Sequence, residues 1–250
     1  CCFGFVCCGV ISVRWYLGDA DFWQNGYTFF MGVAHNIAAG NGISIDVGHP
    51  TAFRVPLYPV FLSVVTLGDQ VFLPIVFCQS LIGVGTVLCT ALITREMFGS
   101  TAAIIAAIMV AIYPYYVLHD TALQETSLYT FLTALAVFLL QQARRNGSGV
   151  IAAGAGLALG AAVLTRVSLA PFAMLAPMWL VVPGRARSEP PRKRLWAAGL
   201  CAAMLMLTVS PWVIRSYWLN GSATLSTETG FFLWLGNNPY TFSNYPSESI

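Results

Sequence analysis

The chain has 250 residues, of which 57% are apolar and only 9% are charged, and its formal net charge is +2. A mean hydropathy of +0.72 lies outside the range of soluble globular domains and excludes a soluble enzyme. We therefore expect an integral membrane protein whose partners include the lipid bilayer and no nucleic acid.

The beginning of the chain predicts a shortened first span. Only about thirteen apolar residues precede Arg14, whereas a spanning helix needs roughly 20. No basic region precedes this run, which argues against a cleaved signal peptide. The seven cysteines lie inside apolar runs, so neither a disulfide framework nor a zinc site is expected. We expect residues 1–250 to be one transmembrane domain that is truncated at both ends.

Later apolar runs are near or above the length of a membrane span. They cover residues 71–94, 101–118, 122–141, 149–183 and 195–213. The fourth run would measure roughly 52 Å as one helix, against a hydrocarbon core of roughly 30 Å. We expect it to form two short spans with Arg166 at the turn. The fold class is then all-α, a polytopic transmembrane helix bundle with about seven spans.

The distribution of charge predicts the orientation of the bundle. The basic clusters are Arg95, Arg144 with Arg145, and the loop 184–194. The positive-inside rule places them on the cytoplasmic side. The outer side then holds residues 14–70, residues 118–125, Arg166 and everything after Arg215. Eight of the ten acidic residues fall on this outer side, which supports the orientation.

The first outer loop predicts an amphipathic helix. One face would carry Tyr27, Phe30, Met31, Ala34 and Ile37, and the other Asn25, Thr28, Gly32, His35 and Asn36. We expect an interfacial helix on the outer membrane surface that ends near Gly40. Residues 51–65 have only about 13 apolar residues after Arg54, so they predict a re-entrant or interfacial helix. Plain membrane anchoring would explain both segments as well.

A series of short motifs resembles one known family. The motifs are "NIAAGNGIS", "FRVPLYPVFL", "HDTALQETSLYTF", "LTRVSLAPF", "SPWVIRSY" and "TETGFFLWLGNNPY". Their order resembles the amino-terminal half of the GT-C glycosyltransferases. It is most similar to the family 39, protein O-mannosyltransferase-like group that includes the lipid A aminoarabinose transferase. The resemblance implies transfer of a sugar from a polyprenyl-phosphate carrier to an acceptor outside the cytoplasm, here at a bacterial inner membrane.

Such a transferase needs cations at the phosphate of its donor. Negative charge grows on the leaving phosphate, and arginine can bind its oxygens through several charge-assisted hydrogen bonds. Arg166 is the first candidate, because an arginine between apolar spans is costly without a partner. Arg54 and Arg215 are further candidates. Each of the three could instead extend to lipid headgroups.

The acceptor needs a carboxylate that takes its proton. Asp19 and Asp21 fit this role, and the resemblance implies a catalytic acid just after the first span. We expect one of the two to face the reacting centre, and we favour Asp21. The alternative is a solvated acidic loop.

Other outer polar residues are candidates for substrate binding. They are Asp120, Glu125, His35, Tyr58, Asn237 and Asn238. Asp120 could instead cap the following helix, whereas Glu125 is expected about a turn and a half inside it. Three outer histidines make a divalent metal conceivable, but their spacing does not support one, so neither metal nor cofactor is expected.

Two other functions remain open from the sequence. A transporter or lipid flippase would also carry intramembrane charges, but it should place them near the bilayer midplane on broken helices. Here the polar residues gather on one face, which favours chemistry at the membrane surface. An inactive truncated relative is the third possibility.

Overall fold

The computed structural model describes residues 28–182 and 190–238, which are mostly helical. The helices are α2 (Thr28–Ala38), α3 (Leu57–Thr66), α4 (Phe72–Phe98), α5 (Ser100–Ala111), α6 (Pro114–Asp120), α7 (Thr126–Asn146), α8 (Gly149–Val163), α9 (Ala170–Val181), α10 (Pro191–Asn220) and α11 (Glu228–Asn237). A 3-10 helix, η1, covers Val167–Leu169, and two short antiparallel strands form β1 (Ser44–Asp46) and β2 (His49–Pro50). This hairpin is a small departure from the all-α expectation.

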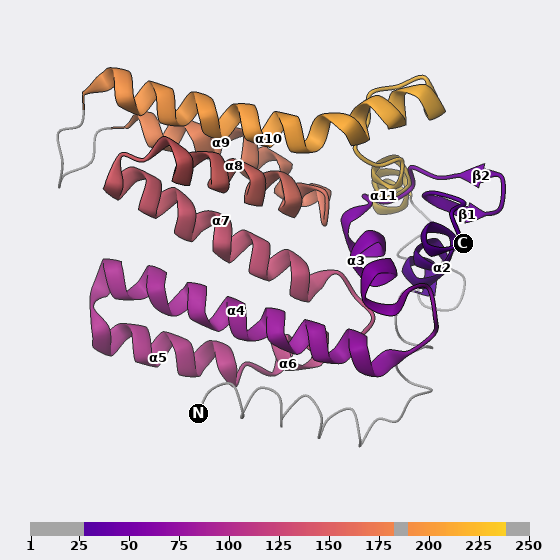
Figure 1. Cartoon of the computed structure of the whole chain (residues 1–250), viewed down its shortest axis with the longest axis horizontal. Coiled ribbons are helices and arrows are strands. Elements are labelled where there is room, and N and C mark those ends of the chain that lie inside the picture. Colours follow the sequence, from indigo (N-terminus) through magenta and orange to yellow (C-terminus); the bar gives the residue numbers. More distant parts are fainter. Residues whose placement is uncertain (1–27, 183–189, 239–250) are drawn as a thin grey trace.

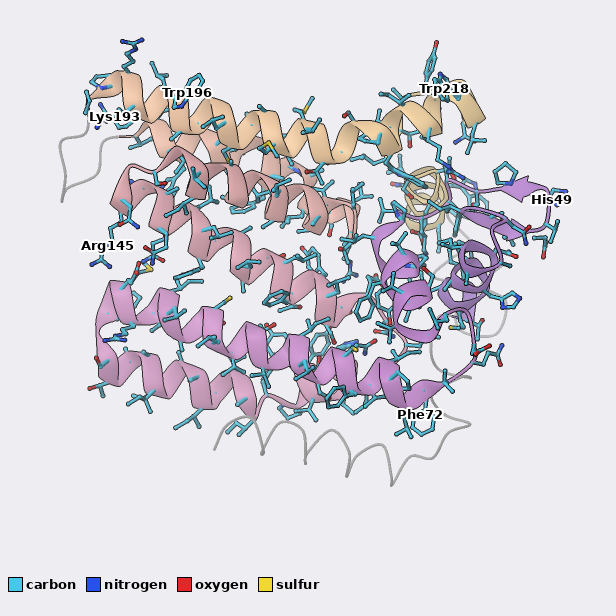
Figure 2. All side chains as sticks on the ribbon, in the orientation of Figure 1. His49, Phe72, Arg145, Lys193, Trp196 and Trp218 are labelled. Carbon is cyan, nitrogen blue, oxygen red and sulfur yellow. The ribbon has the colours of Figure 1, made fainter. Side chains whose placement is uncertain are left out.

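The long helices lie side by side as a bundle, and the short elements gather at one end of it (Figure 1). We call the end with α2, α3, β1, β2 and α11 the hairpin end, and the opposite end the basic end. Figure 2 shows Arg145 and Lys193 at the basic end and His49 at the hairpin end. Glu96 joins the basic end through an ion pair with Arg145, whose Nη1 lies 3.2 Å from its Oε1. Asp46 in β1 and Glu228 in α11 belong to the hairpin end, so acidic and basic residues are unevenly distributed between the two ends, as the sequence predicted.

The sides of the bundle are apolar enough for a lipid environment. Large side chains such as Leu73, Ile104 and Met174 are more than half exposed, which would be unfavourable in water. By length and hydropathy, three described helices could cross a membrane, namely α4, α7 and α10. If the bent pair of helices α5 and α6 is treated as a single span, the number of candidate spans in the described residues rises to four. The expected number of about seven spans stays a prediction.

Breaks in the helices have identifiable causes. The run 149–183 is divided as expected, with Arg166 in an extended conformation between α8 and η1. The run 101–118 was expected to be one span, but α5 and α6 meet at a bend of 53°. Pro114 lacks an amide hydrogen and disfavours a helical conformation at Tyr113, which is extended.

Helix α2 forms where the sequence predicts an amphipathic helix, and Gly40 follows it with a φ of 82°. Its apolar residues Phe30, Met31 and Ala34 are buried in one cluster with residues of α3 and α4. Asn36 was assigned to the polar face, and that assignment is wrong. Its side chain is buried and donates hydrogen bonds to the carbonyls of Ser44 and Ile45, which hold the hairpin against α2. The position of α2 at a membrane surface stays a prediction.

Glycines allow α8 and α10 to pack closely. A Cβ atom on Gly156 would lie 2.2 Å from the carbonyl oxygen of Cys201, and one on Gly160 would lie 2.6 Å from Cβ of Thr208. Small residues at a helix interface let two backbones approach closely. Such close packing matters most in lipid, where the hydrophobic effect does not drive helices together. This contact fixes the end of α8, and therefore the turn that carries Arg166.

The substitution Gly156→Ala should therefore destabilise the bundle. We expect a loss of roughly 1–3 kcal/mol, because the added methyl group meets backbone atoms that cannot move independently. Gly199→Ala is the matched control, since no atom lies within 4 Å of a Cβ placed there. Thermal unfolding in detergent would compare the two variants. Equal midpoints would contradict the close packing of α8 on α10.

Candidate functional site

A cavity of about 280 Å³ opens at the hairpin end and is lined by five separate stretches of the chain. Its charged lining residues are Arg54, Glu125, Arg166 and Glu228, and Phe30, Thr165, Ser168 and Ser226 are among the others. Three of these charged residues were singled out from the sequence, where they lie far apart. The fold brings Arg54, Glu125 and Arg166 to one place, which we call the charged cavity.

Arg54 enters the charged cavity from the segment before α3. Its Nη2 lies 2.5 Å from Oε1 of Glu228, and each of the two side chains is 17% exposed. The guanidinium carbon also lies 5.1 Å from the centre of the Phe30 ring, within the range of a cation–π interaction. Arg54 is thus held in a fixed position while it still borders the open space.

Arg166 enters the charged cavity from the turn between α8 and η1. The residue is exposed, and its guanidinium carbon lies 5.7 Å from the centre of the Tyr129 ring. Among the described residues, none forms a hydrogen bond or an ion pair with this guanidinium. Its hydrogen-bond donors are therefore available to an anion that enters the cavity.

Arg215 has a different environment from the other two arginines. Its Nη1 donates to the carbonyl oxygen of Thr51 at 2.8 Å, and its Nη2 donates to that of Ile43 at 2.7 Å. Its guanidinium carbon also lies 5.0 Å from the ring centre of Trp212. Arg215 does not line the charged cavity. Its hydrogen bonds connect α10 to the residues on either side of the β1–β2 hairpin.

Glu125 lies at the N-terminal boundary of α7 and not inside the helix as the sequence predicted. The reason is that α6 continues to Asp120 and an irregular turn follows, so α7 begins later than expected. The Oε2 atom of Glu125 is buried and has no hydrogen-bond partner in the described part of the chain. A buried carboxylate oxygen of this kind is costly unless a ligand or water satisfies it.

A buried polar network supports the turn that carries Glu125. The Tyr58 hydroxyl donates to Oε1 of Gln79 at 2.8 Å, and Nε2 of Gln79 donates to the carbonyls of Asp120 and Ala122 at 3.1 and 2.9 Å. Burial, and secondarily the charge of Glu125, raises the pKa of Tyr58, so the phenol stays neutral and keeps donating. Tyr58 is only 1% exposed and lines none of the described cavities.

Gln79 was missed by the sequence reasoning. The sequence could have indicated it, since Gln79 is the one amide side chain in the apolar run 71–94. A lone amide within an apolar span needs several buried partners, and the fold supplies them at the turn between α6 and α7.

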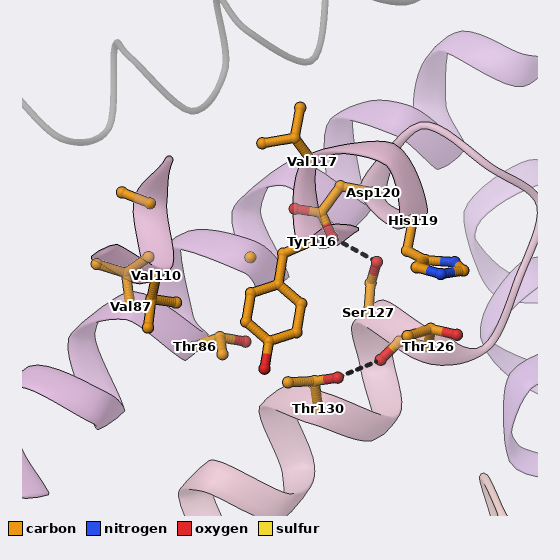
Figure 3. A pocket seen from close by; sticks show the side chains of 12 residues that line it. Thr86, Val87, Val110, Tyr116, Val117, His119, Asp120, Thr126, Ser127 and Thr130 are labelled. Atoms are coloured by element: carbon orange, nitrogen blue, oxygen red, sulfur yellow. Dashed lines mark hydrogen bonds between the residues drawn. The ribbon is translucent and has the colours of Figure 1, made fainter. Parts of the chain in front are cut away.

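Asp120 lines a second, smaller cavity of about 20 Å³ between α4, α5, α6 and α7 (Figure 3). One carboxylate oxygen accepts a hydrogen bond from the Ser127 hydroxyl, which joins the end of α6 to the first turn of α7. Gly83 leaves room for the other, because a Cβ there would lie 2.3 Å from it. This volume suits about one water molecule. Asp120 therefore braces two helices and does not occupy the N-cap of α7.

The remaining candidates lie away from the charged cavity. His35 is exposed beside an open hollow, and its Nδ1 lies 3.0 Å from the carbonyl oxygen of Gly68. The Asn237 amide donates to the carbonyl of Leu233, and Asn238 follows at the end of α11. Asp19 and Asp21 lie outside the described residues. Within those residues, no group of three or more His, Cys, Asp or Glu side chains could hold a metal ion.

Glu228 and Ser226 complete the charged cavity, although no local pattern predicts them there. Glu228 was grouped only with the outer acids. Its local sequence does not reveal that the segment before α11 pairs with the segment before α3, through Thr227 N to Ala52 O at 3.2 Å.

A comparison with protein families agrees with the resemblance seen in the motifs. The family model described as dolichyl-phosphate-mannose-protein mannosyltransferase matches residues 49–214. The matched region includes Arg54, Glu125 and Arg166, and it stops before Glu228. No curated protein and no solved structure shows a significant match to the chain.

The substitution Arg215→Ala should lower stability, because it leaves two backbone carbonyls without their charged donor. We expect a loss of about 2 kcal/mol in thermal unfolding, since hydrogen bonds to charged groups are among the stronger ones. Arg166→Ala is the matched control and should change stability by less than about 0.5 kcal/mol. The assignment of Arg215 to the scaffold would be wrong if its variant unfolds at the wild-type temperature.

Proposed function

The chain belongs to the dolichyl-phosphate-mannose-protein mannosyltransferase family, and from this premise we propose a reaction for the charged cavity. Membership makes the protein a membrane glycosyltransferase whose donors are sugars linked to polyprenyl phosphate. We propose that it moves one such sugar to a lipid, glycan or protein acceptor on the outer face of the membrane.

The observation that carries the proposal is the meeting of two arginines and two glutamates around one cavity. In the proposed reaction, an acceptor oxygen attacks the anomeric carbon and forms the new glycosidic bond. The bond from that carbon to the phosphate oxygen breaks, and its electron pair stays on the phosphate. Arg166 and Arg54 stabilise this growing charge, which is worth most where water is partly excluded.

The acceptor loses its proton to a carboxylate in the same step. We propose Asp21 for this role, with Asp19 as the alternative, from their place after the first apolar run. Glu125 is proposed to bind the sugar, because its Oε2, which has no partner among the described residues, can accept a hydrogen bond from a sugar hydroxyl. The attack from the face opposite the phosphate would invert the anomeric carbon.

The orientation is proposed from the two ends of the bundle. Arg145 and Lys193 belong to the end opposite the charged cavity, and Arg95 lies beside Glu96 in the last turn of α4. Excess basic residues mark the cytoplasmic side. The charged cavity would then face the periplasm of a bacterial inner membrane, or the exterior. A carrier tail would remain in the bilayer while its phosphate reaches the hairpin end.

The substitution Arg166→Ala should weaken binding of a polyprenyl-phosphate-linked sugar by roughly 10- to 100-fold, because it removes charge-assisted hydrogen bonds to the phosphate. Arg166→Lys should restore only part of this affinity, since an ammonium lacks the planar fork. Binding can be measured with the protein in lipid nanodiscs. Arg145→Ala, at the basic end, is the control. Wild-type affinity in the Arg166→Ala variant would reject the proposed phosphate site.

The substitution Asp21→Asn should slow turnover by roughly 10²–10⁴-fold, because the amide cannot accept the acceptor's proton. Donor binding should be retained, and Asp19→Asn should have a far smaller effect. Steady-state kinetics with a saturating donor would compare the variants. If only Asp19→Asn slows turnover strongly, Asp19 is the general base. Normal turnover in both variants would show that neither aspartate accepts the acceptor's proton.

A further inference from the structure

The charged cavity is electrically balanced in the described residues. Arg54 and Arg166 are positive, and Glu125 and Glu228 are negative. A phosphate that enters such a site does not meet an excess of positive charge, although phosphate binding is the task proposed for it. Arg166 can meet this phosphate directly, whereas Arg54 can do so only if Glu228 gives up its place on the guanidinium.

The ion pair between Arg54 and Glu228 is suited to an exchange in which a phosphate replaces the carboxylate. The two side chains are in contact at 2.5 Å, and both border the cavity with 17% of their surface exposed. Partial exposure keeps water nearby, so the cost of separating the charges is far below that of a dry ion pair. An incoming phosphate oxygen can take the place of the carboxylate on the guanidinium.

Glu228 would stay close to the phosphate after the exchange, because its backbone is fastened to the segment that carries Arg54. The Glu228 amide lies 3.3 Å from the carbonyl oxygen of Phe53 and 3.1 Å from the Ser226 hydroxyl. Glu228 is also the first residue of α11, where the helix dipole favours a carboxylate. The carboxylate of a released Glu228 therefore stays beside the bound anion and repels it.

The repulsion affects donor and product to different extents. The donor phosphate is a diester with one negative charge, whereas the product is a polyprenyl phosphate monoester with a charge of about −1.5 to −2 at neutral pH. Two arginines alone would bind the more highly charged product more tightly than the donor. A fixed carboxylate opposes this preference, since its repulsion grows with the charge of the ligand.

We propose that Glu228 is an internal counter-ion that competes with the product phosphate for Arg54 and so speeds its release. The inference rests on the proposed function and deepens it. Glu228 is a positioning residue here, because it acts on the reaction through Arg54 and does not touch the reacting carbon. The chemical group that it discriminates is the lipid phosphate monoester.

The test uses Glu228→Gln in the protein as it exists in the membrane. We expect polyprenyl phosphate to inhibit this variant at about tenfold lower concentration than the wild type, while KM for the donor falls only about threefold. The kcat should also fall, because the product leaves more slowly. Glu228→Asp keeps the charge and should return the ratio of product inhibition constant to KM toward the wild-type value.

Glu96→Gln is the matched control, because Glu96 is 16% exposed and pairs with Arg145 at the basic end. Glu96→Gln should leave the ratio of product inhibition constant to KM unchanged. If the effect of Glu228→Gln came only from the loss of an ion pair, both variants should change this ratio. An unchanged ratio in Glu228→Gln, with polyprenyl phosphate still inhibiting the wild type, would overturn the counter-ion alone. If polyprenyl phosphate neither binds nor inhibits the wild type, the proposed function fails, and this inference fails with it.

Discussion

The backbone of residues 51–57 is hydrogen-bonded to three distant parts of the chain, in addition to the nearby Ile43, and the charged cavity depends on these bonds. Leu57 N donates to the carbonyl of Leu164 at 3.0 Å, and Arg215 reaches the carbonyl of Thr51 from α10. The segment before α11 supplies the third set of bonds. A non-helical segment beside a membrane bundle is tolerated only when its amides and carbonyls find partners. Satisfying them is what places Arg54 next to the turn that carries Arg166.

The same constraint explains why the polar groups of the bundle are either paired inside or collected at an end. Between the helices, the Gln79 amide satisfies two carbonyls at the turn after α6, and Ser127 satisfies Asp120. Ionic groups lie where the helices stop, because charge is least costly near the interface. A lipid-linked phosphate is found at the same depth, since its tail is apolar and its head is charged. The proposed function requires cations at that depth, and the arginines of the charged cavity could supply them.

The sequence predicted what depends on length and local pattern, and it failed where distant segments meet. The break at Arg166 followed from helix length, and the helix over residues 28–38 followed from periodicity. The proline at position 114 could have predicted the bend before it. The burial of Asn36 and the position of Glu125 could not have been predicted, because each depends on a partner segment that no local pattern identifies. Glu228 is the clearest case, since only the folded chain shows that it faces Arg54.

The balance of charge among the described residues of the charged cavity also bears on how arginines can be kept at the edge of a bilayer. An arginine without a partner is unfavourable there, so the resting protein pairs Arg54 with Glu228 and leaves Arg166 exposed to solvent. In the proposed exchange, Arg54 would pass from the carboxylate of Glu228 to the phosphate of an arriving lipid without losing an anionic partner. The cost of the exchange is then the difference between two ion pairs and not the full cost of desolvating a charge. A site built in this way can bind and release a charged lipid without rearranging the bundle around it.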